Sequence, residues 1–257
     1  MLDTQALLKI EGVSKSYNGV EVLENITFTL NGGTCFGLVG NNGVGKSTLI
    51  NILIDLIRAN SGRIEIDGKT YEQNGMEIRQ IMGILPEASP INEELTAYEQ
   101  LWLTGLMYRI PKNELSIRIN SLFSYFFDDM KELYQDCASY STGMRQKLGL
   151  IAALMHKPKI LILDEPFSGL DPTSSHQLIE FLNSYLNTDR VILLSSHNLS
   201  YVEKIANRVG ILHEKHFVYD GSMEDLTEKG TRVIEHSLFE LIKPQRKDEG
   251  GIQWLMN

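Results

Sequence analysis

The sequence predicts an α/β fold in which parallel strands alternate with helices. Three short runs are almost entirely apolar, at residues 34–40, 160–163 and 191–196. Runs of this kind are typical of strands that are buried on both faces. Segments with helical spacing follow them, at residues 46–57, 174–187 and 199–207. Alternation of buried strands with helices predicts a parallel sheet covered by helices.

The remaining segments add two smaller units. Residues 6–33 alternate loosely between apolar and polar side chains, which predicts two or three antiparallel strands. Residues 58–69 return to a turn and a strand, and short strands are expected around 208–221. The stretch from about 90 to 157 is mainly helical in pattern and is rich in aromatic residues. It predicts an inserted helical subdomain.

The expected domain organisation follows from these elements. One domain spans residues 1–225, with its core at about 1–89 and 158–225 and its helical subdomain at about 90–157. A short C-terminal tail covers residues 226–257. Within it, the stretch 243–251 is polar and suggests a solvated, mobile segment, whereas 252–257 is apolar enough to dock.

Composition excludes several classes of protein. The 257 residues carry a formal net charge of −9, so we expect no nucleic-acid partner. Two cysteines, Cys35 and Cys137, form no disulfide framework, which fits a reduced, cytoplasmic setting. No stretch approaches the ~18–20 apolar residues of a membrane span, and the first residues do not resemble a secretory signal. If the protein acts at a membrane, another polypeptide must span it.

A phosphate-binding motif follows the first buried strand. The sequence GNNGVGKST matches G-x-x-x-x-G-K-[ST] and directly opens a helix, which is the context that a P-loop requires. Its glycines allow a tight turn that aims backbone N–H groups at phosphate oxygens. The lysine supplies charge to the β- and γ-phosphates, and the serine hydroxyl ligates Mg²⁺. The predicted nucleotide-binding residues are Gly40, Asn41, Asn42, Gly43, Val44, Gly45, Lys46, Ser47 and Thr48.

Polar residues follow the other two buried strands. Asp164 ends the second strand and is predicted to hold Mg²⁺, while Glu165 follows at once as a candidate general base. His197 comes directly after the third strand and is predicted to contact the γ-phosphate. Parallel strands deliver such residues to one sheet edge, where ligands bind in open α/β folds. Glu165, His197 and Lys46 are therefore the expected catalytic residues.

A second candidate anion site lies at residues 140–150, YSTGMRQKLGL. Ser141, Thr142 and Gly143 form a small-residue turn that leads into a helix-like stretch. This arrangement presents backbone N–H groups and a helix N-terminus. The same groups would also serve a simple helix cap.

Taken together, the motifs in about residues 7–225 resemble the ATP-binding subunit of ABC transporters. The P-loop, the strand ILILDEP at 160–166 and His197 match the Walker A, Walker B and switch motifs of that family. Residues 84–90 fall at the Q-loop, 140–144 at the signature and 168–171 at the D-loop, which includes Asp171. Tyr17 falls where the family has an aromatic ring that stacks on adenine.

The resemblance implies a P-loop NTPase core of RecA-like type, with ATP and Mg²⁺ as ligands. In this family two ATP-binding subunits form a head-to-tail dimer, so Ser141, Thr142 and Gly143 would meet the γ-phosphate held by the partner. The second subunit could be identical or a paralogue. Membrane permease subunits would complete the transporter and hold this chain, as a peripheral protein, at the cytoplasmic face of the cell membrane.

Two positions depart from the family pattern. Glu87 replaces the usual Q-loop glutamine and adds a negative charge to the expected metal-binding set of Ser47, Glu87 and Asp164. Met144 replaces the last glutamine of the signature. The variant sequences are more similar to ABC-2-type exporters than to importers. An importer subunit, or a soluble ABC ATPase acting on DNA, ribosomes or assembly scaffolds, remains the alternative.

The aromatic stretch at residues 122–130, LFSYFFDDM, has two interpretations. The first is packing of the rings in the core of the helical subdomain. The second is a groove beside Glu87 that receives a short helix from a membrane subunit.

Overall fold

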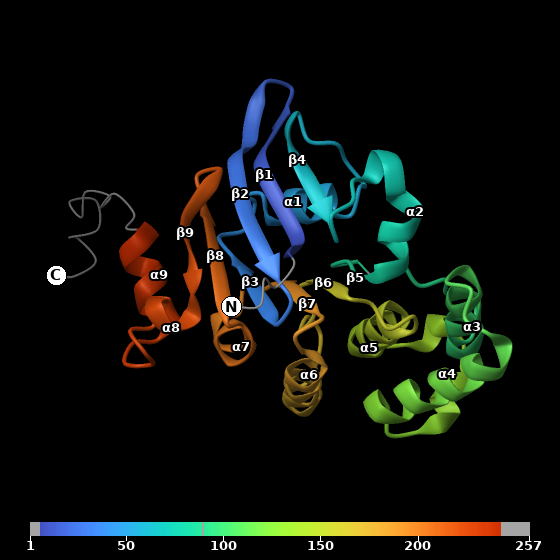
Figure 1. The fold of residues 1–257 in the computed structure, drawn as a ribbon. Helices are drawn as coiled ribbons and strands as arrows, with labels where there is room; N and C mark the ends of the chain where they lie inside the picture. Colours follow the sequence, from blue (N-terminus) through green and yellow to red (C-terminus); the bar gives the residue numbers. More distant parts are fainter. Residues whose placement is uncertain (1–5, 89, 243–257) are drawn as a thin grey trace.

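Two sheets organise the chain, and the computed structural model describes residues 6–88 and 90–242 (Figure 1). The first sheet is antiparallel, in the order β2-β1-β4. The second has the order β5-β6-β7-β3-β8-β9, and all of its neighbouring strands are parallel except β8 and β9. The strands are β1 (Ala6–Tyr17), β2 (Val20–Asn31), β3 (Thr34–Val39), β4 (Ser61–Ile66), β5 (Met82–Leu85), β6 (Ile160–Asp164), β7 (Val191–Ser195), β8 (Arg208–His213) and β9 (His216–Ser222).

Helices lie around these sheets in separate groups. Helices α3, α4 and α5 gather on one side of the molecule, whereas α8 and α9 lie on the opposite side (Figure 1). The α-helices are α1 (Lys46–Leu53), α2 (Tyr71–Ile81), α3 (Ala97–Met107), α4 (Lys112–Phe126), α5 (Thr142–Leu154), α6 (Pro172–Tyr185), α7 (Leu199–Ile205), α8 (Met223–Leu226) and α9 (Ile234–Ile242). Short 3₁₀ helices cover Met130–Tyr134 and Cys137–Ser139. No helix in the described ranges has the length and apolar character needed to cross a membrane.

The central strands are buried on both faces, as their apolar runs predict. Every residue of β6 and β7 is buried. Side chains alternate between the faces of a strand, so Ile160 and Ile162 pack with the antiparallel sheet and α1. Leu161 and Leu163 pack instead in the second apolar cluster, which includes residues of the helical block formed by α3, α4 and α5. One sheet therefore separates two apolar cores, and its strand register is fixed from both sides.

Sequence reasoning did not identify α2 and β5, which connect the antiparallel sheet to the helical block. The strand β5 has only four residues, and it pairs with β6 at the edge of the sheet. Its Gly83 permits close packing, because a Cβ atom there would lie 2.3 Å from the carbonyl oxygen of Ala153. This short strand places Glu87 two residues beyond its end.

Part of the segment assigned to the C-terminal tail forms helix α9. Ile234 is fully buried, and the Ser237 hydroxyl donates a hydrogen bond to the carbonyl oxygen of Leu226 at 2.7 Å. These contacts attach α9 to the fold. The stretches 243–251 and 252–257, which the sequence suggested were mobile and docking segments, lie outside the described residues.

The three phenylalanines of the aromatic stretch at residues 122–130 pack in the core, as the first of its two interpretations states. Phe123, Phe126 and Phe127 are buried, and the rings of Phe123 and Phe127 stack with centroids 4.1 Å apart. Phe126 meets Phe181 of α6 edge to face at 5.1 Å. The stretch therefore joins α4 to α6, and its three buried phenylalanines do not form an open groove beside Glu87.

A partly buried histidine, His156, links the segment after α5 to the sheet. His156 Nε2 lies 2.8 Å from the carbonyl oxygen of Met82, and its ring stacks on Tyr108 with centroids 3.6 Å apart. Its Nδ1 atom is buried and has no hydrogen-bond partner among residues 6–88 and 90–242. Burial lowers the pKa of His156 to about 4, and the nearby Arg118 also disfavours a second positive charge. The folded protein therefore holds this imidazole in its neutral form.

This lowered pKa predicts that acid destabilises the fold through His156. In the unfolded chain His156 takes up a proton near pH 6.5, whereas in the folded chain it does so only near pH 4. The contribution of neutral His156 to the free energy of unfolding is therefore fully present above pH 6.5 and is lost as the pH falls toward 4. We expect the loss to reach about 1–2 kcal/mol after allowance for solvent screening. Urea unfolding from pH 7.5 to 4.5 measures it. His156→Phe keeps a stacked ring and should lack this component; an identical pH dependence in both proteins would contradict the assignment.

Candidate active site

A cleft of about 420 Å³ lies where the parallel strands end. It draws residues from the segments after β3, β5, β6 and β7, because the carboxyl ends of these parallel strands share one edge. Ten of the residues predicted from the sequence line this cleft, together with Ser168. The lining is Asn42, Gly43, Gly45, Lys46, Ser47, Thr48, Glu87, Asp164, Glu165, Ser168 and His197.

The loop between β3 and α1 has the conformation that its glycines permit. Gly43 and Gly45 have backbone φ angles of +79° and +117°, which residues with a Cβ atom rarely adopt. Gly45 also lies close to β2, since a Cβ atom there would be 3.1 Å from the carbonyl oxygen of Val22. The antiparallel sheet therefore supports the loop from outside.

Lys46 closes the loop on itself. Its Nζ donates hydrogen bonds to the carbonyl oxygens of Gly40 at 2.7 Å and Asn41 at 3.2 Å. The residue is only 7% exposed, and this burial lowers the pKa of its ammonium group. The nearby carboxylates raise the pKa of Lys46, and the effect decreases from Glu165 to Asp164 to Glu87. The cleft thus holds one buried cation among three acidic side chains.

A single hydroxyl group aligns the two acidic residues that follow β6. Ser195, at the end of β7, donates its Oγ hydrogen to Oδ1 of Asp164 and accepts a hydrogen bond from the backbone N–H of Glu165 at 3.1 Å. Asp164 and Ser195 are also paired in the parallel register of β6 and β7. Sequence reasoning did not assign a role to Ser195, although a polar residue at the end of a buried strand was a usable signal.

Glu165 and His197 meet across the cleft. Nδ1 of His197 lies 2.8 Å from Oε2 of Glu165. The His197 side chain is 68% exposed, whereas that of Glu165 is mostly covered. If Nδ1 carries the proton in this contact, Nε2 is left to face solvent or a ligand. This contact can hold the Glu165 carboxylate in a fixed position in the cleft.

The cleft offers oxygen ligands of the kind that Mg²⁺ prefers. The Ser47 hydroxyl and the carboxylates of Glu87 and Asp164 all line it. Among the described residues, no group of three His, Cys, Asp or Glu side chains forms a metal site by itself. Mg²⁺ commonly takes one or two carboxylates and completes its shell with water and substrate phosphates. The residues present therefore fit a Mg²⁺–nucleotide site.

The predicted signature residues lie elsewhere. Ser141 is the N-cap of α5, and its Oγ accepts a hydrogen bond from the backbone N–H of Met144 at 3.2 Å. Gly143 packs on the D-loop, where a Cβ atom would lie 2.6 Å from the carbonyl oxygen of Gly169. Ser141 and Thr142 are exposed. Within the described lining of the cleft, none of the three signature residues is present.

Asp171 and Tyr17 also lie outside that lining. Asp171 caps α6 by accepting hydrogen bonds from the backbone N–H groups of Thr173 and Ser174, at 2.9 and 3.0 Å. Hydrogen bonds from Ser174 lower the pKa of Asp171. Tyr17 ends β1 and is half-exposed, with the Lys15 ammonium 5.0 Å from its ring centroid. Their predicted contacts with nucleotide would require a ligand or a second chain that extends beyond this cleft.

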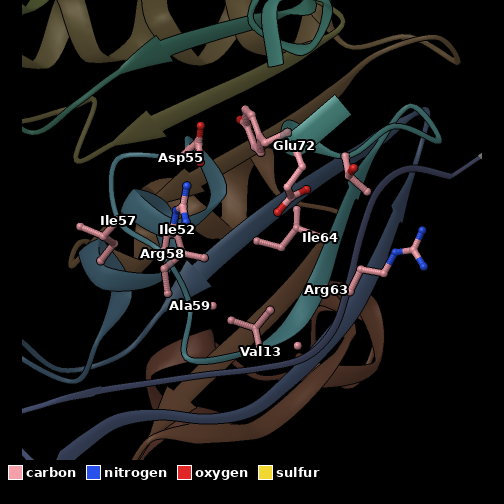
Figure 2. Close-up of a pocket in the computed structure, with 12 residues that line it drawn as sticks. Val13, Ile52, Asp55, Ile57, Arg58, Ala59, Arg63, Ile64 and Glu72 are labelled. Atoms are coloured by element: carbon pink, nitrogen blue, oxygen red, sulfur yellow. The ribbon is translucent and has the colours of Figure 1, made fainter. Parts of the chain in front are cut away.

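A second cavity of about 290 Å³ lies between β4, the end of α1 and the start of α2 (Figure 2). Its walls combine aliphatic side chains such as Ile52 and Ile64 with the charged groups of Asp55 and Glu72. Asp55 is already paired with Arg79 at 2.8 Å. No residue predicted from the sequence to bind nucleotide lines this cavity.

Fold and site together define a nucleotide hydrolase of the P-loop class. A glycine loop between a buried strand and a helix, an aspartate at the end of a neighbouring strand and a following glutamate are the parts that phosphoryl-transfer sites require.

Comparison with known proteins narrows this class. The family model described as "ABC transporter" matches residues 23–168. The lantibiotic transport ATP-binding protein SrtF of Streptococcus pyogenes is 33% identical over 226 residues, which are 86% of this chain and 95% of that protein. The linearmycin resistance ATP-binding protein LnrL of Bacillus subtilis is 32% identical over 89% of this chain and 74% of its own length.

A solved structure described as the ATP-binding subunit of an ABC transporter agrees with a TM-score of 0.85 at 33% identity, covering 91% of this chain and 99% of that one. The chain belongs to the ABC transporter family. It is an ATP-binding subunit that hydrolyses ATP in support of transport.

Proposed function

We propose that this chain is the ATPase subunit of an exporter, that it works as a dimer around two MgATP molecules, and that it drives separate membrane subunits from the cytoplasmic face of the membrane. Similar proteins support the direction of transport, since one relative, from Rhizobium meliloti, is named a Nod factor export ATP-binding protein and is 31% identical over 93% of this chain. The geometry of the cleft supports the chemistry.

In the proposed reaction, Glu165 is the general base. Its carboxylate accepts a proton from the water that attacks the γ-phosphorus, while the bond from that phosphorus to the β–γ bridging oxygen breaks and ADP leaves. The hydrogen bond to His197 keeps the carboxylate in place. Lys46 and the loop N–H groups stabilise the negative charge on the phosphoryl oxygens. Ser47, Glu87 and Asp164 would hold Mg²⁺, which neutralises charge on the β- and γ-phosphates when bound.

One observation carries the dimer proposal: the signature residues do not line the cleft of their own chain. Ser141 and Thr142 are nevertheless exposed at the N-terminus of a 13-residue helix, where unpaired backbone N–H groups favour an anion. A second copy or a paralogue, placed head to tail, would bring this helix to the open side of the cleft.

Two inactive variants test this arrangement. Lys46→Ala should lose its grip on the phosphates of its own ATP, and Ser141→Arg should block the position of the partner's γ-phosphate. A mixed dimer gathers both defects in one site and leaves the other intact. Mixing should therefore restore ATP hydrolysis, to about half per mixed dimer if the sites act independently.

Crosslinking verifies that mixed dimers form, and each variant assayed alone is the control. A verified mixed dimer without activity, in preparations where wild-type homodimers are active, would contradict a shared site.

Four exposed apolar side chains on helices α3 and α4 mark the proposed docking site for the membrane subunits. Leu103, Leu106 and Met107 of α3 and Ile117 of α4 are exposed, and Met107 is 80% accessible. Helix α3 begins at Ala97, shortly after the segment that carries Glu87. Contact there would connect the metal-binding side of the cleft to the membrane partner.

A negative charge placed among these apolar side chains should weaken binding of the membrane subunits. Met107→Glu should lower co-purification with co-expressed membrane subunits by about tenfold, since a carboxylate at the centre of an apolar contact must be desolvated. Basal ATP hydrolysis of the isolated subunit should stay unchanged. Met76→Glu, on exposed helix α2, is the matched control. Equal recovery of the membrane subunits with both variants would exclude this surface.

A further inference from the structure

Gln146 links the signature helix to the catalytic cleft of the same chain. It lies on α5 and is only 6% exposed. Its Nε2 donates a hydrogen bond to the backbone carbonyl oxygen of Glu165 at 3.1 Å. The backbone N–H of Ser168 donates to the same oxygen, also at 3.1 Å. The side chain is thus committed to the turn that presents the glutamate.

That turn has a conformation which needs support. Glu165 has a φ angle of +49°, in the left-handed region that residues other than glycine seldom occupy. Such strain persists where surrounding contacts over-determine it. Here Ser195 holds the N–H of Glu165 and Gln146 holds its C=O. The two hydrogen bonds fix the peptide groups on either side of the Glu165 Cα, and hence the direction of its carboxylate.

The anchors differ in where they come from. Ser195 belongs to β7, inside the rigid sheet, whereas Gln146 belongs to α5. Helix α5 begins immediately after Ser141, and the N–H of Arg145 donates to the carbonyl oxygen of Ser141 at 2.9 Å in its first turn. Gln146 therefore lies little more than one turn from the exposed helix end. A displacement of that end would be carried through one rigid turn to the carbonyl of Glu165.

We propose that Gln146 is a positioning residue for ATP hydrolysis: it sets the place of the Glu165 carboxylate and links that place to the position of the signature helix. The proposal rests on the role of Glu165 as general base. Engagement of Ser141 by the partner's nucleotide would in this way adjust the base of the other ATP site, the one in the same chain as that Ser141.

The test replaces the amide donor while keeping the volume of the side chain. Gln146→Met removes the donor, and Gln146→Glu replaces it with an acceptor that repels the carbonyl oxygen. Steady-state hydrolysis by the purified protein should show kcat lowered by about 10- to 100-fold, because small misplacements of a catalytic group have effects of this size. The KM and the Kd for ATP should change little in both variants, since the P-loop is untouched. Gln146→Glu buries a carboxylate and should lower the melting temperature, whereas Gln146→Met should leave it nearly unchanged.

The matched control is Gln177→Met on α6. Gln177 also donates its amide hydrogen to a backbone carbonyl, that of Tyr125, away from the cleft lining. Its kcat should remain within about twofold of wild type. A wild-type kcat in either folded Gln146 variant would overturn the proposal. A parallel loss of ATP affinity would also overturn it, because that result indicates a general distortion of the cleft.

Glu165→Gln separates this inference from the role on which it rests. As a base variant it should bind MgATP and lose hydrolysis by about 10²–10⁴-fold. Wild-type turnover in Glu165→Gln would remove the general base itself. An inactive Glu165→Gln together with a fully active Gln146→Met would leave the base in place and reject only the positioning role of Gln146.

Discussion

The parallel pairing of completely buried strands is the constraint on which the rest of the structure depends. β3, β6 and β7 pair in one direction, with Leu38 and Asp164 both opposite Ser195, so the segments that follow them emerge at the same edge. Apolar cores on both faces of the sheet fix this register, because a slip of one residue would turn each side chain toward the wrong core. The cleft forms where these segments meet the segment after β5, which carries Glu87.

At that edge of the sheet, a small number of side chains each make several of the contacts that shape the cleft. Ser195 holds both Asp164 and the backbone of Glu165, so the proposed metal ligand and the proposed base share one support. Lys46 fills the loop with its own charge and is held by two carbonyl oxygens. We infer that bound phosphate would compete for those donor hydrogens, which couples nucleotide binding to the shape of the loop. Gln146 adds a support from outside the sheet, on helix α5.

The sequence predicts those parts of the fold that are marked by a pattern of a few consecutive residues. The P-loop glycines, the all-apolar run of β6 and the acidic pair after it each occupy a few consecutive residues. The strand β5 was not identified, because four residues give no clear periodicity and its place depends on pairing with β6. Gln146 and Ser195 were also not identified as site residues, since their partners lie 19 and 30–31 residues away in sequence. The capping of α6 by Asp171 had a local signal, an Asp directly before a Pro at the helix start, which sequence reasoning did not use.

The most direct test of the central claim is a structure of the Glu165→Gln protein with MgATP. We expect the triphosphate to lie in the cleft at the ends of β3, β6 and β7, with Lys46 Nζ within about 3 Å of phosphate oxygens and Mg²⁺ on the Ser47 hydroxyl beside Asp164. Ser141 of a second chain is expected at the γ-phosphate. A triphosphate bound elsewhere, such as the cavity beside Asp55 and Glu72, with Lys46 still bonded only to Gly40 and Asn41, would contradict the account.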